Sequence, residues 1–129
     1  VLGWAVGLPH DVVLSLAPKS VTAPVAMGIS EKIGGIPALS AVFAVLTGMV
    51  GALSGKYLFD AMRLATDPEG YAARGFALGT ASHGIGAARA LQVDAQAGAY
   101  AGLALGLQVL LAALLMPLAF RLLPLFGSQ

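Results

Sequence analysis

The stretch that decides the fold is RGFALGTASHGIGAARAL, residues 74–91. Fourteen residues without Asp, Glu, Lys or Arg separate Arg74 from Arg89. As a helix, such a run covers about 21 Å, which is less than the roughly 30 Å hydrocarbon core of a bilayer. Its centre holds Ser82 and His83, followed closely by two glycines. The segment is therefore apolar enough for a membrane, but too short and too interrupted for an ordinary spanning helix.

The rest of the chain has the composition of a membrane protein. Of its 129 residues, 58% are hydrophobic and only 10% are charged, whereas about 25% are charged in soluble domains. Residues 33–55 and 95–120 are two runs of 23 and 26 residues without a charged side chain, and roughly 20 apolar residues span a bilayer. The run at 20–30 holds only 11 residues. The sequence thus predicts an all-α integral membrane protein, a helical bundle with two long transmembrane helices and two short or broken membrane helices.

These elements predict a single membrane domain over residues 1–129, the C-terminal portion of a longer protein. The expected elements are the end of a preceding transmembrane helix at 1–9, a short membrane helix at 20–35, a transmembrane helix at 36–59, a broken membrane helix at 71–92 and a transmembrane helix at 95–121. A polar connection at 56–74 carries the turn sequence DPEG. Placing this connection in the cytoplasm puts five of the seven basic residues inside, as the positive-inside rule requires. We therefore expect four passes, with residues 10–19 and the C-terminus in the cytoplasm.

An internal similarity indicates a repeat of two units. TAPVAMGISEK begins at Thr22 and TASHGIGAARA begins at Thr80, an offset of 58 residues, and Glu31 aligns with Arg89. Only three of eleven positions are identical, so chance similarity in a chain rich in Ala and Gly stays open. Repeated units with broken helices hold the substrate near the membrane midplane in secondary transporters.

The centre of residues 74–91 is the first candidate site. Gly84 and Gly86 favour a break, because glycine costs about 1 kcal/mol relative to alanine in a helix and permits positive φ. The backbone N–H groups at the start of a half-helix attract anions. The alternative is that the glycines serve only close helix packing. The predicted substrate-binding residues are Thr22, Glu31, Thr80, Ser82, His83, Gly84, Gly86 and Arg89.

The second candidate stretch is KSVTAPVAMGISEKIGG, residues 19–35. Thr22 is expected to cap a helix with Pro24 in its first turn, and Gly34 is expected to close it before Pro37 opens the next helix. Glu31 either pairs or moves a proton inside the membrane, or lies at the outer interface. The remaining acidic residues are expected to be solvated loop charges: Asp11, Asp60, Asp67, Glu69 and Asp94.

Enzyme, metal and cofactor sites are not indicated. The chain has no cysteine, and its two histidines, His10 and His83, lie far apart in the sequence. There is no nucleophile elbow and no phosphate-binding loop, and a net charge of +1 gives no reason to expect nucleic acid. We therefore expect a protein that is not an enzyme and uses no cofactor.

The two candidate stretches resemble the signatures of the LrgB/CidB family of bacterial membrane proteins. PKSVTAPVAMGISEKIGGIPALSAVFAVLTGMVGA is similar to the first signature, and RGFALGTASHGIGAARAL to the most distinctive one. GAYAGLALGLQVLLAALLMPL is similar to the closing helix, although Gln108 stands where the family pattern has Asn. The resemblance covers nearly the whole chain, as the C-terminal half of a family member.

The resemblance implies a multi-pass protein of the bacterial inner (cytoplasmic) membrane, embedded in the lipid bilayer, with one of two functions. The first is transport or export of small 2-hydroxy or 2-oxo monocarboxylates such as glycolate, glycerate or pyruvate. The second is a holin/antiholin-like role in regulating murein hydrolase activity and cell lysis, with an LrgA/CidA-type membrane partner. A homo-oligomer is compatible with both functions. Because a half-helix anion site suits a compact carboxylate, transport is our first expectation and lysis regulation is the alternative.

Overall fold

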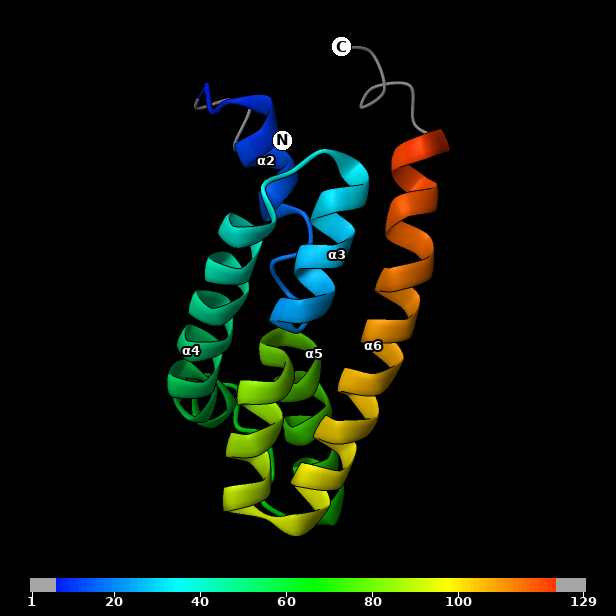
Figure 1. The fold of residues 1–129 in the computed structure, drawn as a ribbon. Helices are drawn as coiled ribbons and strands as arrows, with labels where there is room; N and C mark the ends of the chain where they lie inside the picture. Colours follow the sequence, from blue (N-terminus) through cyan, green and yellow to red (C-terminus); the bar gives the residue numbers. More distant parts are fainter. Residues whose placement is uncertain (1–6, 123–129) are drawn as a thin grey trace. The chain divides into compact units, whose positions relative to one another are not determined.

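The computed structural model describes residues 7–122, which form five helices and contain no strand. The helices shown in Figure 1 are α2 (His10–Leu16), α3 (Ala23–Ile33), α4 (Pro37–Ala61), α5 (Pro68–Val93) and α6 (Ala95–Leu122). The predicted all-α class is confirmed. By length and composition, α4 and α6 are long and apolar enough to cross a membrane, and they coincide with the two long predicted helices. The helix end expected at residues 1–9 lies largely outside the described residues.

The chain divides into two compact units. Within the described residues, unit 1 contains 7–44 and 109–122, and unit 2 is Val45–Gln108. Since α4 and α6 each cross the boundary between these ranges, each contributes residues to both units.

Unit 1 is organised around Ser15 at the end of α2. The Ser15 hydroxyl donates to the carbonyl of Asp11 at 2.6 Å and accepts from the backbone N–H of Ile36 at 2.7 Å. The hydroxyl of Ser40 donates to the Ser15 carbonyl at 2.8 Å. The end of α2 is therefore bonded to the start of α4. The sequence indicated no secondary structure for residues 10–19, because a helix of seven residues is too short to show a clear helical period.

Helix α3 has the expected ends but lacks the expected side-chain cap. Thr22 is the N-cap residue, Pro24 lies in the first turn, and Gly34 closes the helix with φ 86°. Pro37 begins α4. The Thr22 side chain makes no capping hydrogen bond, so the start of α3 depends on its proline. The apolar core of unit 1 lies around α3 and consists of Val21, Ala26, Ile29 and Ala44, with Ala112 and Met116 of α6 against it.

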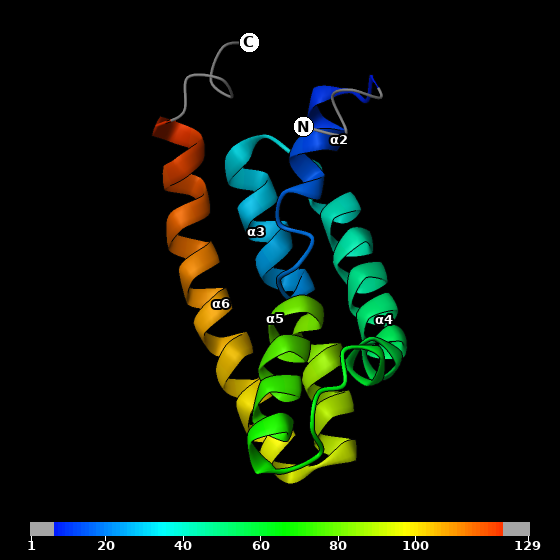
Figure 2. The same ribbon diagram turned by 180° about the vertical axis from the view of Figure 1, so that it is seen from behind.

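Helix α5 is a hairpin rather than one straight helix. Its backbone leaves the helical conformation at His83, with φ 41° and ψ −132°. A Cβ atom added at Gly86 would meet the carbonyl oxygen of Leu78, although eight residues of straight helix would separate these positions by about 12 Å. Leu78 and Ala90 also share one apolar cluster. Figures 1 and 2 show the second part of α5 returning alongside the first, so residues 68–82 and 84–93 are two antiparallel arms.

The hairpin reverses the direction of the chain within residues 68–93. Its first arm has 15 residues and is about 22 Å long, less than the roughly 30 Å hydrocarbon core. Because the arm turns back at His83, the second arm returns to the end of unit 2 at which α5 starts, and the number of membrane passes stays a prediction. Arg89 then lies at the same end of unit 2 as Lys56 and Arg74, with which it lines one pocket. An uncharged run of this length fits a broken span and a re-entrant hairpin equally well, so the sequence could not separate them.

Small residues allow the first arm to pack closely on α6. A Cβ atom at Gly75 would meet the carbonyl of Ala97, and one at Gly79 would meet the carbonyl of Ala101. Pairs of small residues four positions apart are a common way for membrane helices to approach each other. The long helices α4 and α6 begin at residues 37 and 95, which differ by 58, the offset of the sequence similarity. The internal repeat itself stays a prediction.

Candidate functional site

Two places in unit 2 gather polar side chains. The first is the turn of the α5 hairpin, residues 82–86, which we call the hairpin tip. The second is a pocket at the open end of the hairpin, which we call the mouth pocket. The sequence predicted the first place and missed the second.

The hairpin tip contains a buried hydroxyl and a strained histidine. Ser82 is fully buried, and among the described residues its Oγ atom has no hydrogen-bond partner. His83 is 4% exposed and has positive φ, which is uncommon for a residue other than glycine. Such backbone strain costs on the order of 1–3 kcal/mol and concentrates at functional sites. The tip is therefore held in place by its surroundings.

Two glycines of α4 form the wall beside the tip. A Cβ atom at Gly48 would lie 2.6 Å from His83 Cε1 and 3.0 Å from His83 Nε2. One at Gly51 would overlap the hydroxyl of Ser82. The sequence alone did not indicate a role for these two glycines. The sequence feature that could have revealed them is the spacing of Gly48, Gly51 and Gly55 along one face of α4. Gly55 faces Leu78.

The second arm of the hairpin begins at the tip. The first backbone N–H groups of a helix have no partner within that helix, and the start of a helix carries the positive pole of its dipole. Nothing among the described residues lies within 4 Å of a Cβ position at Gly84, whereas Gly86 packs against Leu78 and Ser82. Close packing of the helices therefore explains the glycine at Gly86. No contact among the described residues explains the glycine at Gly84.

The other predicted residues lie elsewhere. Thr80 is exposed and its hydroxyl donates to the Phe76 carbonyl at 2.8 Å, so it bonds within its own helix. Thr22 and Glu31 belong to unit 1, where Glu31 is exposed on α3. A pairing of Glu31 with Arg89 of unit 2, and a site shared by the two residues, stay predictions.

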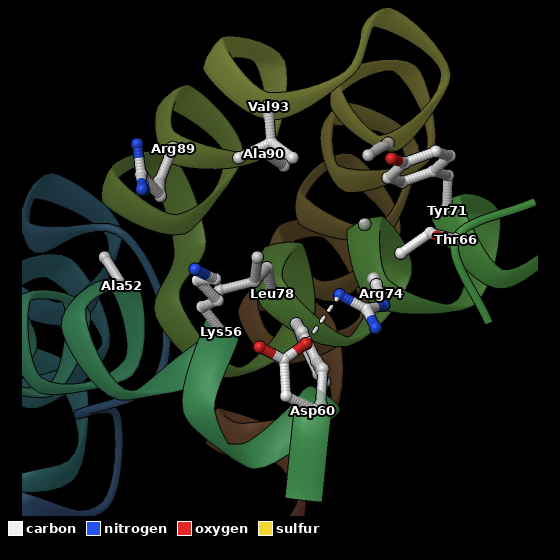
Figure 3. A pocket seen from close by; sticks show the side chains of 13 residues that line it. Ala52, Lys56, Asp60, Thr66, Tyr71, Arg74, Leu78, Arg89, Ala90 and Val93 are labelled. Carbon is white, nitrogen blue, oxygen red and sulfur yellow. Dashed lines mark hydrogen bonds and ion pairs between the residues drawn. The ribbon is translucent and has the colours of Figure 1, made fainter. Parts of the chain in front are cut away.

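The mouth pocket lies among the end of α4, the loop after it, both arms of α5 and the first turn of α6 (Figure 3). It has a volume of about 380 Å³, within the range of roughly 300–1,000 Å³ typical of small-molecule sites. Phe59, Leu78 and Ala90 give it apolar walls. Its polar lining comprises Lys56, Asp60, Thr66, Tyr71, Arg74 and Arg89.

Arg74 is the most constrained cation of the mouth pocket. Its Nη1 atom lies 3.3 Å from Asp60 Oδ1, and its Nη2 donates to the Leu64 carbonyl. Its guanidinium carbon lies 5.7 Å from the centroid of the Phe59 ring, a favourable cation–π position. The side chain is only 13% exposed, and among the described residues its buried Nε has no partner. Arg74 therefore joins the hairpin to the end of α4 and the loop that follows.

Lys56 and Arg89 are less constrained. Arg89 Nη1 lies 3.4 Å from the side-chain oxygen of Gln92 on the same arm. Both residues are exposed, and neither belongs to the ion pair found within residues 7–122, which joins Arg74 and Asp60. Both line the mouth pocket, Lys56 from α4 and Arg89 from the second arm of α5 (Figure 3).

Three acidic residues expected to be solvated loop charges have structural roles. Asp60 pairs with Arg74. Asp67 Oδ1 accepts from the backbone N–H of Gly70 at 2.8 Å and caps α5. Asp94 Oδ1 accepts from the backbone N–H of Gln96 at 2.8 Å and caps α6, as acidic residues before a helix commonly do. Within residues 7–122, no group of three or more His, Asp or Glu side chains is placed to hold a metal ion.

Comparison with known proteins gives consistent matches. The model of the family described as "LrgB-like family" matches residues 1–122. The chain is 32% identical over 118 residues to "Holin-like protein CidB" of Staphylococcus aureus (strain Mu50 / ATCC 700699), covering 92% of this chain and 50% of that protein. It is 42% identical over 84 residues to "Uncharacterized protein YwbG" of Bacillus subtilis (strain 168), covering 65% and 36%. The chain thus spans about half the length of the CidB protein, and its match to YwbG covers a smaller share of that protein. No solved structure matches it.

Proposed function

This chain belongs to the LrgB-like family, and we propose that it is part of a holin-like membrane protein that regulates murein hydrolase activity and cell lysis. The observation that carries this proposal is the similarity of 92% of the chain to a protein named holin-like. The inference from the sequence ranked this function second, below transport. The similarity favours it over transport, since it names a holin-like relative and no substrate.

The exposed apolar surface of α6 supports a role inside a bilayer or a membrane assembly. Large apolar side chains are exposed along this helix at Leu103, Leu107, Leu110, Leu114 and Leu118. Exposed apolar patches mark membrane or protein contacts. A lipid bilayer, an LrgA/CidA-type partner or another copy of the protein would each cover such a surface, and the partner and the oligomer are part of the proposal.

A second candidate function, transport of small 2-hydroxy or 2-oxo monocarboxylates, is favoured by the hairpin tip. Ser82 brings a buried hydroxyl, which has no hydrogen-bond partner within residues 7–122, to the start of a half-helix beside the strained His83. Half-helix N-termini with free amides bind anionic groups in secondary transporters. A passive lytic pore has no evident need for a strained histidine at this position.

Flux through liposomes separates the two functions. The full-length protein is reconstituted, and release of an unrelated dye is measured beside uptake of labelled glycolate, glycerate or pyruvate. The holin-like function predicts non-saturating release of the dye, which is stronger with an LrgA/CidA-type partner present. Saturable uptake of one carboxylate, competed by close analogues and without dye leakage, would refute it and support transport. In cells, deletion of the gene should change extracellular murein hydrolase activity under the holin-like proposal.

A further inference from the structure

The mouth pocket has an excess of positive charge that its own residues do not neutralise. Its charged lining consists of three cations, Lys56, Arg74 and Arg89, and one carboxylate, Asp60. The carboxylate is bonded to Arg74, so the charges of Lys56 and Arg89 remain. These two residues come from different elements, α4 and the second arm of α5, and are brought to one pocket by the reversal at His83.

The apolar walls and the hydrogen-bond donors of the pocket determine which kind of ligand it can bind. Phe59 and Leu78 offer apolar surface to a carbon skeleton, and the hydroxyl of Tyr71 can donate a hydrogen bond. Arg74 also lines the pocket, but its Nη1 and Nη2 atoms are occupied by Asp60 and by the Leu64 carbonyl.

We propose that the mouth pocket binds a small dianion, with Lys56 and Arg89 holding its negative charges. A monoanion would neutralise only one of the two remaining cations, whereas a dianion of the same size neutralises both. Short dicarboxylates and phosphate share this charge, and they differ in whether the two charges are spread along a carbon chain or gathered on one group. The proposal stands independently of the holin-like function, because it concerns binding and not membrane permeability.

Isothermal titration of the purified full-length protein in detergent tests the proposal. The probes are succinate and inorganic phosphate, both dianions near neutral pH or above, and butyrate, a monoanion with the same number of carbons as succinate. We expect succinate or phosphate to bind at least tenfold more tightly than butyrate, a difference of about 1.4 kcal/mol. Raising the ionic strength should reduce this preference, since charges near a surface are screened.

Matched variants connect the binding to the pocket. Lys56→Gln and Arg89→Gln should each abolish most of the preference for the dianion, whereas Lys56→Arg, which keeps the charge, should retain it. Lys32→Gln is the control, because Lys32 is an exposed lysine of α3 that does not line the pocket. The site is supported if the preference for the dianion is lost in the Gln variants and retained in Lys56→Arg. This comparison still holds if one of the two Gln variants fails to fold.

Three results would overturn the proposal. The first is equal affinity for butyrate and the dianions, and the second is an unchanged preference in Lys56→Gln and Arg89→Gln. The third is binding that occurs only with an anionic phospholipid: titration in nanodiscs with and without phosphatidylglycerol distinguishes a lipid headgroup from a soluble ion. Failure in any of these tests leaves dye release and murein hydrolase regulation unaffected, so the two proposals fail separately.

Discussion

Replacement of Gly79 by alanine tests whether the first arm of the hairpin packs against α6. Gly79 is buried, and a Cβ atom there would lie 2.7 Å from Ala101 Cα and would overlap the Ala101 carbonyl oxygen. Carbon atoms in contact normally lie about 3.5–4.0 Å apart, so the arm and α6 would have to separate by roughly 1 Å. Backbone atoms cannot rotate aside as a side chain can. Overpacking of this kind costs about 1–3 kcal/mol of the free energy of unfolding.

Gly102→Ala in α6 is the matched control. Nothing among the described residues lies within 4 Å of a Cβ position at Gly102, and alanine is favoured over glycine in a helix by about 1 kcal/mol. Because alanine gains this propensity in both helices, the overpacking remains as the difference, and we expect Gly79→Ala to be less stable than Gly102→Ala by roughly 1–3 kcal/mol. The free energy of unfolding is measured by SDS titration of the purified protein in mixed micelles. Equal stability of the two variants would show that the first arm does not pack closely on α6.

Three further predictions concern topology, the mouth pocket and the hairpin tip. Because α5 returns to the end at which it starts, single cysteines at Glu69 and Gln96 should be labelled from the same side of the membrane by an impermeant thiol reagent, and opposite sides would indicate a straight crossing helix. Arg74→Lys should lower the free energy of unfolding by about 1–3 kcal/mol, because one ammonium group cannot bond the Leu64 carbonyl and the facing carboxylate in the same geometry; an unchanged denaturation midpoint would contradict this. If the second candidate function holds, His83→Gln should keep substrate binding while altering the pH dependence of flux, since glutamine bonds but does not titrate near neutral pH, and an identical pH profile would exclude proton transfer at this residue.

Elements of the fold that depend on local chemistry could be predicted from the sequence. Charge-free runs marked the two long helices, and the residues at the ends of α3, Thr22 and Gly34, have the positions expected of them. Glycines at 84 and 86 indicated a break in the segment where the backbone of His83 is non-helical. The strained residue itself is the histidine, because the position of positive φ is chosen by the packing of both arms and not by local preference alone.

Features that depend on the direction of the chain after the break could not be predicted. A charge-free run of 14 residues does not say whether the helix continues or reverses. Consequently the sequence grouped Arg89 with the hairpin tip, whereas the structure places it in the mouth pocket with Lys56 and Arg74. Lys56 and Arg74 were assigned to the polar connection at 56–74, because their place beside Arg89 depends on the reversal at His83. Capping of α6 by Asp94 was also missed, because Asp94 was expected to be a solvated loop charge.

Both candidate sites of unit 2 depend on the reversal at His83. In a straight α5, Tyr71 and Val93 would lie about 33 Å apart, yet both line the mouth pocket, so straightening the helix would abolish the pocket. The same reversal creates the free start of the second arm at the tip. The strain at His83 is therefore the cost of forming two sites from one helix, and the closely fitting glycine at 48 is part of what holds the histidine in that conformation. A change at the tip that relaxes the turn should accordingly weaken ligand binding at the mouth, although no residue of the tip lines that pocket.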